Sequence, residues 1–392
     1  MTLKNILRGL SLAAAFVCLC LPLTNWTRRA GAQRGQAGQA NLPVEQTRKN
    51  IQVLKGLPES QLFPVMNFVA VSLGVKCDFC HVKQKDPKGG EDIWVWESDE
   101  KEHKRIGRQM MRMTLDINKS SSAEAFGNFG VTCYTCHRGT NGAPRMPPLP
   151  VAGDHPAAAS TATPPPRPAR PTPEQILQKY LEAVGGRERI AKVQTTVLKG
   201  TREASQNRSW PIEVTLKGAD KMAIVANVPQ QGAVTQGLSG AQGWIKNPRG
   251  TRAASGDELS TLQRTALMFA PIKIKEPSTS LKPNGRGKVG DRDAWVLMST
   301  AADGTIERYL FDMETGLLLR QTTFTPAVLN LLPEQIDYED YRDVEGIKLP
   351  FTIRISGVDA FFDSTRKFTE IKHNVPVDDA RFQMPAAATA KP

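Results

Sequence analysis

The stretches CDFCH (residues 77–81) and CYTCH (residues 133–137) are two copies of one pattern, Cys-x-x-Cys-His. In this spacing the two thiols can add to the two vinyl groups of one haem, and the adjacent histidine then ligates the iron. A redox dithiol or half of a zinc site would explain a single copy. Two copies behind an export signal instead predict two covalently bound haem c groups, attached through Cys77, Cys80, Cys133 and Cys136.

The N-terminus has the pattern of an export signal. Lys4 and Arg8 precede an apolar stretch at residues 10–23, which is short for a membrane span, and Ala30-Gly31-Ala32 is a small-residue cleavage site. Residues 1–32 are therefore predicted to be a signal peptide, and the mature protein to be periplasmic. The charged pair Arg28-Arg29 directly before the cleavage site is unusual for a signal peptide. The alternative is an uncleaved N-terminal segment that holds the protein at the membrane.

Cysteine and charge counts limit the partners. Of six cysteines, Cys18 and Cys20 lie in the signal and the other four in the haem motifs, so no structural disulfide is predicted. The formal net charge of +12 is compensated in part by the haem propionates. The remaining excess would suit an anionic membrane surface or an acidic redox partner. No Lys/Arg run with interleaved aromatic residues indicates nucleic acid.

Composition divides the chain beyond the signal into four parts. Residues 33–44 are rich in Gln, Gly and Ala and are predicted to be flexible, and residues 45–147 form a helical diheme cytochrome c domain. Residues 148–173 are rich in Pro and Ala and are typical of a semi-rigid linker. Residues 174–392 carry consecutive short strands with tight turns, which predict an antiparallel sheet. The fold class is therefore α+β.

The pattern within the C-terminal region predicts individual elements. Helices are expected at residues 174–184, ended by Gly185-Gly186, and at residues 257–269. Turns are expected at residues 312–316 and 343–346. Strands are expected at residues 195–199, 212–217, 222–228, 294–299, 306–312 and 317–324.

The distal iron ligands are predicted to be methionines. The chain has five histidines, and His81 and His137 serve as the proximal ligands. His155 lies in the linker and His373 in the strand-rich region, so neither is well placed for a second imidazole. Thioether ligation raises the reduction potential relative to bis-histidine ligation.

Met66 is the candidate for the first haem. A helix capped by Ser60 and ended by Gly74 would carry Met66 and Leu73 on one face, and Met66 precedes Cys77 by 11 residues. Helix, glycine turn and motif can then fold back onto one haem. The alternative is that Met66 is an ordinary core methionine.

For the second haem, the helix phase leaves two candidates. A helix from Ser98 to about Asn118 would place Met110 and Met113 on its apolar stripe and Met111 off it. Either methionine satisfies this geometry. His103, one turn earlier among charged residues, is expected to face solvent.

These residues resemble a known family. The stretches NFVAVSLGVKCDFCH (residues 67–81), the helix at 104–118 and GVTCYTCHRG (residues 130–139) are similar to the cytochrome c subunit of photosynthetic reaction centres. The resemblance covers about residues 45–145. It implies Met66 and Met110 as the distal ligands, because the family places its ligand directly after an Arg-x pair, here Arg108-Gln109. The family subunit carries four haems in two pairs, whereas this chain has one pair.

The C-terminal region, with DMETGLLLRQTTF (residues 312–324), loosely resembles the curved sheets of lipoprotein-sorting carriers. That resemblance is one of fold, and it implies an apolar concave face that could take an acyl chain or a peptide.

Three functions follow as hypotheses. The first is a periplasmic electron carrier, not an enzyme, that serves a membrane-bound redox complex, either a photosynthetic reaction centre or a respiratory one. The second is a lipid-binding or lipoprotein-binding protein whose haems act as sensor or stabilising cofactor. The third, a haem peroxidase, needs an open sixth position, and two candidate distal methionines argue against it.

Overall fold

The computed structural model describes residues 42–142 apart from 88, 91 and 121–129, and residues 170–385 apart from 206, 219, 230–231, 249, 270–280 and 359–362. The predicted signal peptide, residues 33–41 and residues 148–169 of the predicted linker lie outside the described residues. Within the described ranges, no helix is both long and apolar enough to cross a membrane.

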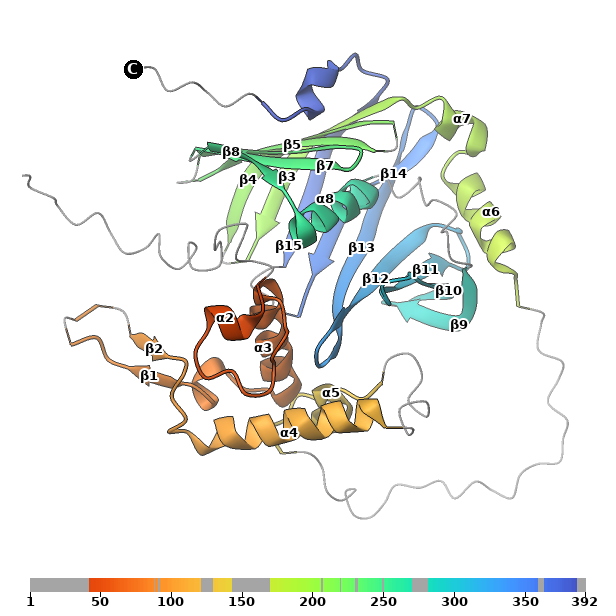
Figure 1. The fold of residues 1–392 in the computed structure, drawn as a ribbon. Helices are drawn as coiled ribbons and strands as arrows, with labels where there is room; N and C mark the ends of the chain where they lie inside the picture. The colour runs from red at the N-terminus through yellow and green to blue at the C-terminus, as the bar shows by residue number, and fades with distance from the viewer. Residues whose placement is uncertain are drawn as a thin grey trace, which may run out of the picture.

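The N-terminal part is helical (Figure 1). Its elements are α2 (Val44–Thr47), α3 (Glu59–Leu73), the 3-10 helix η1 (Cys77–Phe79), the two-stranded ribbon of β1 (Val82–Gln84) and β2 (Ile93–Val95), α4 (Glu102–Lys119) and α5 (Cys133–His137). These elements, within residues 42–142, are called the helical module below.

The ends of α3 and α4 differ partly from prediction. Gly74 ends α3 as predicted, in the left-handed region with φ +64°. The predicted start signals are wrong, because α3 is preceded by Pro58 and α4 by Lys101 at the N-cap. Ser98 instead accepts a bond from the Glu100 backbone N–H at 3.2 Å, which is a local turn that competes with helix.

The C-terminal part that the structure describes forms one sheet of 13 strands. Their order is β8-β7-β6-β5-β4-β3-β15-β14-β13-β12-β11-β10-β9, with antiparallel neighbours throughout. Two meanders, β3 to β8 and β9 to β14, are joined through β15. The strands are β3 (Thr195–Ala204), β4 (Arg208–Lys217), β5 (Lys221–Val228), β6 (Gly232–Ser239), β7 (Gln242–Asn247), β8 (Gly250–Ala254), β9 (Lys282–Val289), β10 (Arg292–Thr300), β11 (Ile306–Asp312), β12 (Leu318–Ala327), β13 (Asn330–Val344), β14 (Ile347–Ser356) and β15 (Ser364–His373).

Helices accompany this sheet where the pattern predicts them. The helix α6 (Pro173–Ala183) begins with a capping box, in which Gln175 N–H donates to Thr172 Oγ1 at 3.3 Å and Thr172 N–H to Gln175 Oε1 at 2.9 Å. It is followed by α7 (Arg187–Ala191), and α8 (Gly256–Phe269) interrupts the strands. A 3-10 helix, η5 (Asp379–Phe382), follows β15. The predicted α+β fold is confirmed.

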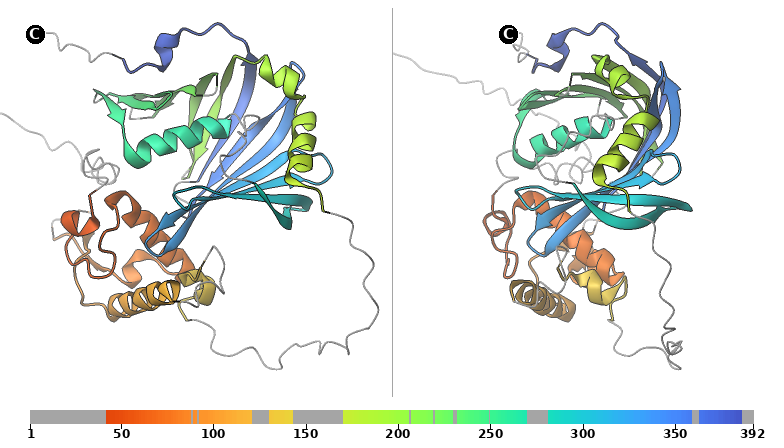
Figure 2. Two further views of the ribbon diagram at one scale, coloured as in Figure 1. Left: turned by 45° about the vertical axis from the view of Figure 1, so that its right-hand side comes forward. Right: turned by 90° about the vertical axis from the view of Figure 1, so that its right-hand side faces the viewer.

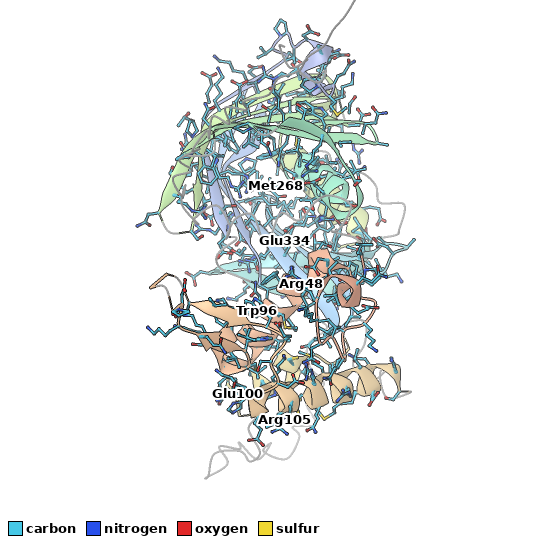
Figure 3. The ribbon with its side chains drawn as sticks, turned by 60° about the vertical axis from the view of Figure 1, so that its left-hand side comes forward. Arg48, Trp96, Glu100, Arg105, Met268 and Glu334 are labelled. Carbon is cyan, nitrogen blue, oxygen red and sulfur yellow. The ribbon has the colours of Figure 1, made fainter. Side chains whose placement is uncertain are left out.

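The sheet curves around α8 (Figure 2). Its inner face carries the main apolar core, to which α6 contributes Tyr180 and α8 contributes Met268. Figure 3 shows Met268 beneath the curved sheet, with Trp96 in the helical module on the other side of the β12–β13 region. Because β-strand side chains alternate between faces, alternate residues of each long strand face this core.

The tip of the β12–β13 hairpin completes a second core inside the helical module. Leu329, in the turn between the two strands, is only 3% exposed and packs with Val44, Leu57 and Val65. Met66 packs, partly buried, against the same cluster. The sheet therefore supplies a core residue to the module that bears the two Cys-x-x-Cys-His motifs.

Candidate functional site

The first motif forms a tight turn directly after α3. Residues 77–79 form η1, and His81 N–H donates to the Cys77 carbonyl at 2.9 Å. Lys101, just before α4, donates from its ammonium to the Asp78 carbonyl. The turn places both cysteines and the histidine on one short loop, as attachment to a single haem requires.

The second motif is itself a helix. Cys133 to His137 form α5, and Thr132 N–H donates to Thr135 Oγ1 at 3.0 Å. Thr135, one of the two variable positions of the motif, thus caps the helix that bears the cysteines. Arg138 follows in the left-handed region with φ +52°, and its side chain is exposed.

The two motifs are joined by close backbone packing. Gly139 N–H donates to the Ser72 carbonyl at 2.9 Å, and a Cβ placed on Gly74 would lie 2.0 Å from the Gly139 carbonyl oxygen. The turn after α3 therefore contacts the turn after α5 with no room for a side chain.

The helix α4 connects the two motifs along its length. Near its start, the His103 ring packs against Phe79 of the first motif in a tilted arrangement, with 4.0 Å between ring centroids. Near its end, the Asn118 amide exchanges two hydrogen bonds of 2.8 Å with the backbone of Val131, two residues before the second motif. At 1.5 Å per residue, the helix spans about 27 Å. His103 is exposed, as predicted.

Both predicted proximal histidines are oriented in the same way. His81 Nδ1 lies 3.3 Å from the Trp96 carbonyl oxygen, and His137 Nδ1 lies 3.0 Å from that of Thr140. Since a carbonyl can only accept, Nδ1 carries the proton in each ring and Nε2 keeps its lone pair. This is the arrangement that orients metal-binding histidines. Burial, together with Lys104, lowers the pKa of His81, so that its imidazole is neutral at neutral pH.

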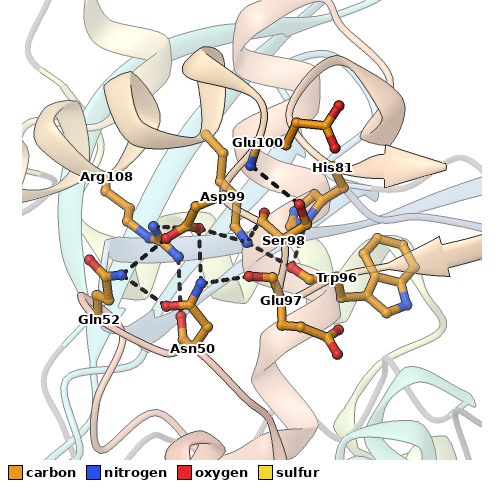
Figure 4. A network of polar contacts seen from close by, with 10 residues as sticks. Asn50, Gln52, His81, Trp96, Glu97, Ser98, Asp99, Glu100 and Arg108 are labelled. Carbon is orange, nitrogen blue, oxygen red and sulfur yellow. Dashed lines mark hydrogen bonds and ion pairs between the residues drawn. The ribbon is translucent and has the colours of Figure 1, made fainter.

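The carbonyl that orients His81 is shared with a lysine (Figure 4). Lys104 Nζ donates to the Trp96 carbonyl at 2.8 Å and to the Ser98 carbonyl at 2.7 Å, and it lies 3.2 Å from Asp99. Only 10% of the Lys104 side chain is exposed. The Thr140 carbonyl, by contrast, accepts no lysine or arginine side chain among the described residues. The two histidines therefore differ in their electrostatic surroundings.

Asp99 holds this network together. It accepts from Arg108 at 2.8 Å and from Asn50 at 2.9 Å, and these bonds hold the pKa of its carboxyl well below the usual range. Because the folded-state pKa is lowered, the contribution of Asp99 to stability is present above its unfolded pKa. It is lost as the pH falls through the lower folded value.

The helical module exposes apolar side chains around the motifs. Eight of the ten large apolar side chains that are exposed in the described residues belong to it. Soluble proteins seldom expose apolar side chains in such a concentration unless they cover a partner or ligand. The eight side chains are Leu42, Val71, Ile93, Trp96, Ile106, Met110, Met113 and Tyr134.

The methionines of α4 separate into two kinds. Met110 and Met113 are 40% and 45% exposed, whereas Met111 packs against the Leu329 cluster. The phase predicted for α4 agrees with this division, and Met110 and Met113 both stay available as ligands. Met66 of α3, partly buried, stays a predicted ligand of the first haem.

The remaining donors fit haem better than a bare ion. Cys77, Cys80, Cys133 and Cys136 are free thiols, and burial raises the pKa of Cys80 and Cys133. The described residues contain no group of three or more His, Cys, Asp or Glu that could hold a metal directly. His373, buried in β15, bonds to Thr196 at 3.1 Å, and His155 lies outside the described residues.

The motif-bearing region is similar to known cytochromes. Residues 32–147 match the family model described as photosynthetic reaction centre cytochrome C subunit. The resemblance predicted for residues 45–145 is thereby confirmed. Haem c, the cofactor that this family implies, supplies a one-electron couple when bound. The residues that would hold it are the four motif cysteines with His81 and His137.

Two curated relatives share this region. Cytochrome c-554 of Chloroflexus aurantiacus is 34% identical over 118 residues, which cover 29% of this chain and 26% of that protein. The photosynthetic reaction center cytochrome c subunit of Thermochromatium tepidum is 32% identical over 122 residues, covering 27% of this chain and 28% of that protein. The chain thus spans about a quarter of the length of these relatives.

Solved structures resemble the sheet. A DUF1329 family protein from Desulfovibrio piger gives a TM-score of 0.41 at 13% identity, covering 54% of this chain and 96% of that one. A LolA superfamily protein from Nitrosomonas europaea gives 0.38 at 15% identity, covering 55% and 98%. These likenesses concern the fold alone.

Sequence reasoning missed the polar network beside His81. Lys104 and Arg108, four residues apart on α4, follow Asp99 closely enough to indicate an ion-pair network. No local pattern indicates that Asn50 joins it, because Asn50 lies far away in sequence with φ +58°.

Replacing Lys104 with methionine is expected to lower the reduction potential of a haem bound at the first motif and to leave that of a haem bound at the second motif unchanged. Loss of a positive charge favours the oxidised iron, and the Trp96 carbonyl would then accept more strongly from His81. A charge at this range is worth on the order of 1 kcal/mol, or about 40 mV for one electron. Spectroelectrochemical titration measures it.

Lys101→Met is the matched control, because Lys101 also donates to a backbone carbonyl of the first motif, that of Asp78. An equal shift in both variants would contradict a specific role for the carbonyl that Lys104 shares with His81.

Proposed function

We propose that residues 45–147 form a diheme c-type cytochrome domain that carries electrons to a membrane-bound redox complex in the periplasm. One haem is attached at Cys77 and Cys80 with His81 and Met66 as axial ligands. The other is attached at Cys133 and Cys136 with His137 and Met110, and Met113 is the alternative. The protein acts as an electron carrier.

One observation carries this proposal. Each Cys-x-x-Cys-His motif holds its histidine with Nδ1 bound to a backbone carbonyl, so that each Nε2 is available to an iron. A zinc site built from the same residues would draw ligands into one cluster, whereas here each motif is a separate short element. The exposed apolar side chains of the helical module support the same cofactor.

The reaction centre family supports a photosynthetic or a related respiratory complex as the partner. The matched family is named after the reaction centre, which favours a photosynthetic partner. The chain has one pair of haem motifs, and this feature alone does not distinguish a photosynthetic from a respiratory complex. The positive net charge of +12 would assist docking at an anionic membrane surface or an acidic partner.

The cysteine pairs give the direct test. After expression with a c-type maturation system, we expect two haems per chain by the pyridine haemochrome assay. Cys77→Ser with Cys80→Ser should leave one, and so should Cys133→Ser with Cys136→Ser, because each pair binds its own haem. A wild-type chain with no covalent haem, or a first double variant that loses both haems while its circular dichroism is unchanged, would contradict the proposal.

A further inference from the structure

The β12–β13 hairpin reaches beyond the strands on either side of it. The pairing of β12 with β11 ends at Phe324, and the pairing of β13 with β14 ends at Gln335. The hairpin ladder continues past both neighbours, as far as the pair of Ala327 with Asn330. Figure 2 shows this extension beside the helical module. Residues 325–332, which form the extension, are called the arm below.

The end of the arm is apolar. Val328 and Leu329 form the two-residue connection between its strands, a place where glycine, asparagine and aspartate are the usual residues. Leu329 is buried in the cluster of the helical module, and Val328 and Leu332 pack against the same cluster. Burial of such side chains is favourable, whereas their exposure at a free turn is not. The residues of the tip therefore suit contact with the module.

Met66 belongs to the face of α3 that meets the arm. Four residues of α3 have the i, i+3, i+4, i+7 spacing of one helix face and belong to the cluster that contains Leu329, and they are Leu62, Val65, Met66 and Val69. Val65 is 1% exposed, whereas Met66 is only partly buried. Met66 therefore lies at the border of the packed face.

Phe63 marks the side of α3 that faces the first motif. Its ring contacts Trp96 with 6.4 Å between centroids, and Trp96 in turn contacts the His81 ring at 5.1 Å. At about 100° per residue, Met66 is about 60° from Phe63 around the helix, and Val65 is about 160° from it. Met66 therefore lies between the face that packs on the arm and the face that adjoins the predicted proximal histidine.

We propose that the arm holds the Met66 side chain in position to ligate the iron of the first haem, with Leu329 as the positioning residue. This inference rests on the proposed function, in which Met66 is the distal ligand. A methionine side chain has three rotatable bonds and loses much of its freedom when it is fixed. Packing against the arm restricts those bonds in advance, so that the thioether competes better for the iron. The sheet thereby governs the distal ligation of a haem in another part of the chain.

Imidazole is the probe in the test, because it binds the oxidised iron only where the distal ligand has been displaced. Its apparent affinity therefore rises with the fraction of haem that lacks the methionine ligand. The full haem-loaded chain is titrated with imidazole and followed by visible absorption. Leu329→Ala should tighten imidazole binding at one of the two haems about tenfold. Leu329→Met, which conserves volume, should bind as wild type, and so should the control Leu331→Ala, which lies on the arm but outside the Leu329 cluster.

The variant Met66→Ala shows whether the arm acts through this ligand. By itself it should tighten imidazole binding more than Leu329→Ala does, because it removes the thioether. In the Met66→Ala background, Leu329→Ala should have no further effect on imidazole binding, since two changes that act through one contact are not additive. A purely structural role of Leu329 would instead lower the urea midpoint of unfolding in both backgrounds and leave the imidazole affinity unchanged.

A second arm variant, Leu332→Ala, guards against a Leu329 variant that fails to fold. Leu332 is only partly buried against the cluster, so its truncation should cost less stability and still tighten imidazole binding. Wild-type imidazole affinity in the folded arm variants, or an equal effect of Leu329→Ala with and without Met66, would overturn the proposal and leave the diheme cytochrome in place. An unchanged affinity in Met66→Ala would overturn Met66 as the distal ligand, and the proposal with it.

Discussion

Replacing Gly74 with alanine is expected to destabilise the helical module by about 2–5 kcal/mol. Gly74 has φ +64°, a region that costs an L-residue about 1–2 kcal/mol. The larger part comes from the Gly139 carbonyl, which would lie 2.0 Å from the new Cβ. No side-chain rotation relieves a contact with backbone, so the turns after α3 and α5 must separate.

Moving these two turns apart would disturb both Cys-x-x-Cys-His motifs. Gly139 lies two residues after the second motif, and its hydrogen bond to Ser72 ties it to the helix before the first motif. We therefore expect lower covalent haem incorporation at both sites, measured as haem per chain, and a lower midpoint of urea unfolding followed by circular dichroism.

The control variant Gly56→Ala separates the cost of an unfavourable backbone φ from the cost of a steric clash. Gly56 has φ +83°, but nothing lies within 4 Å of the position its Cβ would take. This control should lose only the conformational contribution of about 1–2 kcal/mol. If the two variants unfold at the same urea concentration, the packing of Gly74 against Gly139 has no energetic role.

Truncating Leu329 to alanine is expected to destabilise the helical module although the residue belongs to the sheet. Leu329 fills the cluster of Val44, Leu57 and Val65. Leu→Ala in a packed core typically costs about 2–5 kcal/mol. The loss should appear as faster amide hydrogen exchange in α3, measured by mass spectrometry on the haem-loaded protein.

Leu331→Ala, two residues further along the same hairpin, is the matched control. Leu331 pairs with Pro326 in the ladder and lies outside the Leu329 cluster. Unchanged exchange in α3 in the Leu329 variant, or an equal increase in both variants, would show that the hairpin tip does not support the module.

The residues of the two motifs could be predicted from the sequence because each motif is defined by residue types at a short, fixed spacing. Two cysteines and a histidine within five residues define each motif, and Gly74 marks the end of α3 because few other residues adopt its φ. The helix starts were less predictable. Ser60 and Ser98 look like caps, yet α3 starts after Pro58, whose fixed φ suits the position before a helix, and Ser98 bonds within a turn.

Several strands were not predicted, among them β6 and β9, which lack an apolar alternation, and also the apolar β14, IKLPFTIRIS. The strand β9 reads KPNGRGKV and β6 reads GAVTQGLS, without the alternation that marks a half-buried strand. Their place in the sheet is set by pairing with β10 and with β5 and β7. β-Strand formation depends on neighbours more than on intrinsic preference, so a single segment contains too little information.

Contacts between separate elements explain what else was missed at the candidate site. Lys104 reaches the Trp96 carbonyl only because α4 folds beside the segment after β2. Likewise, the aliphatic run around Leu329 is an unusual hairpin tip, and its sequence does not reveal that it enters the core of another part of the chain.

The Leu329 contact also affects the order in which the parts of the protein fold. A chain synthesised from its N-terminus presents both Cys-x-x-Cys-His motifs long before Leu329 has been added. We expect the motif-bearing segment to persist as a loosely packed intermediate during that interval, since contacts distant in sequence form late. Haem attachment would then act on an open chain, and arrival of the hairpin would close the module around its finished cofactors.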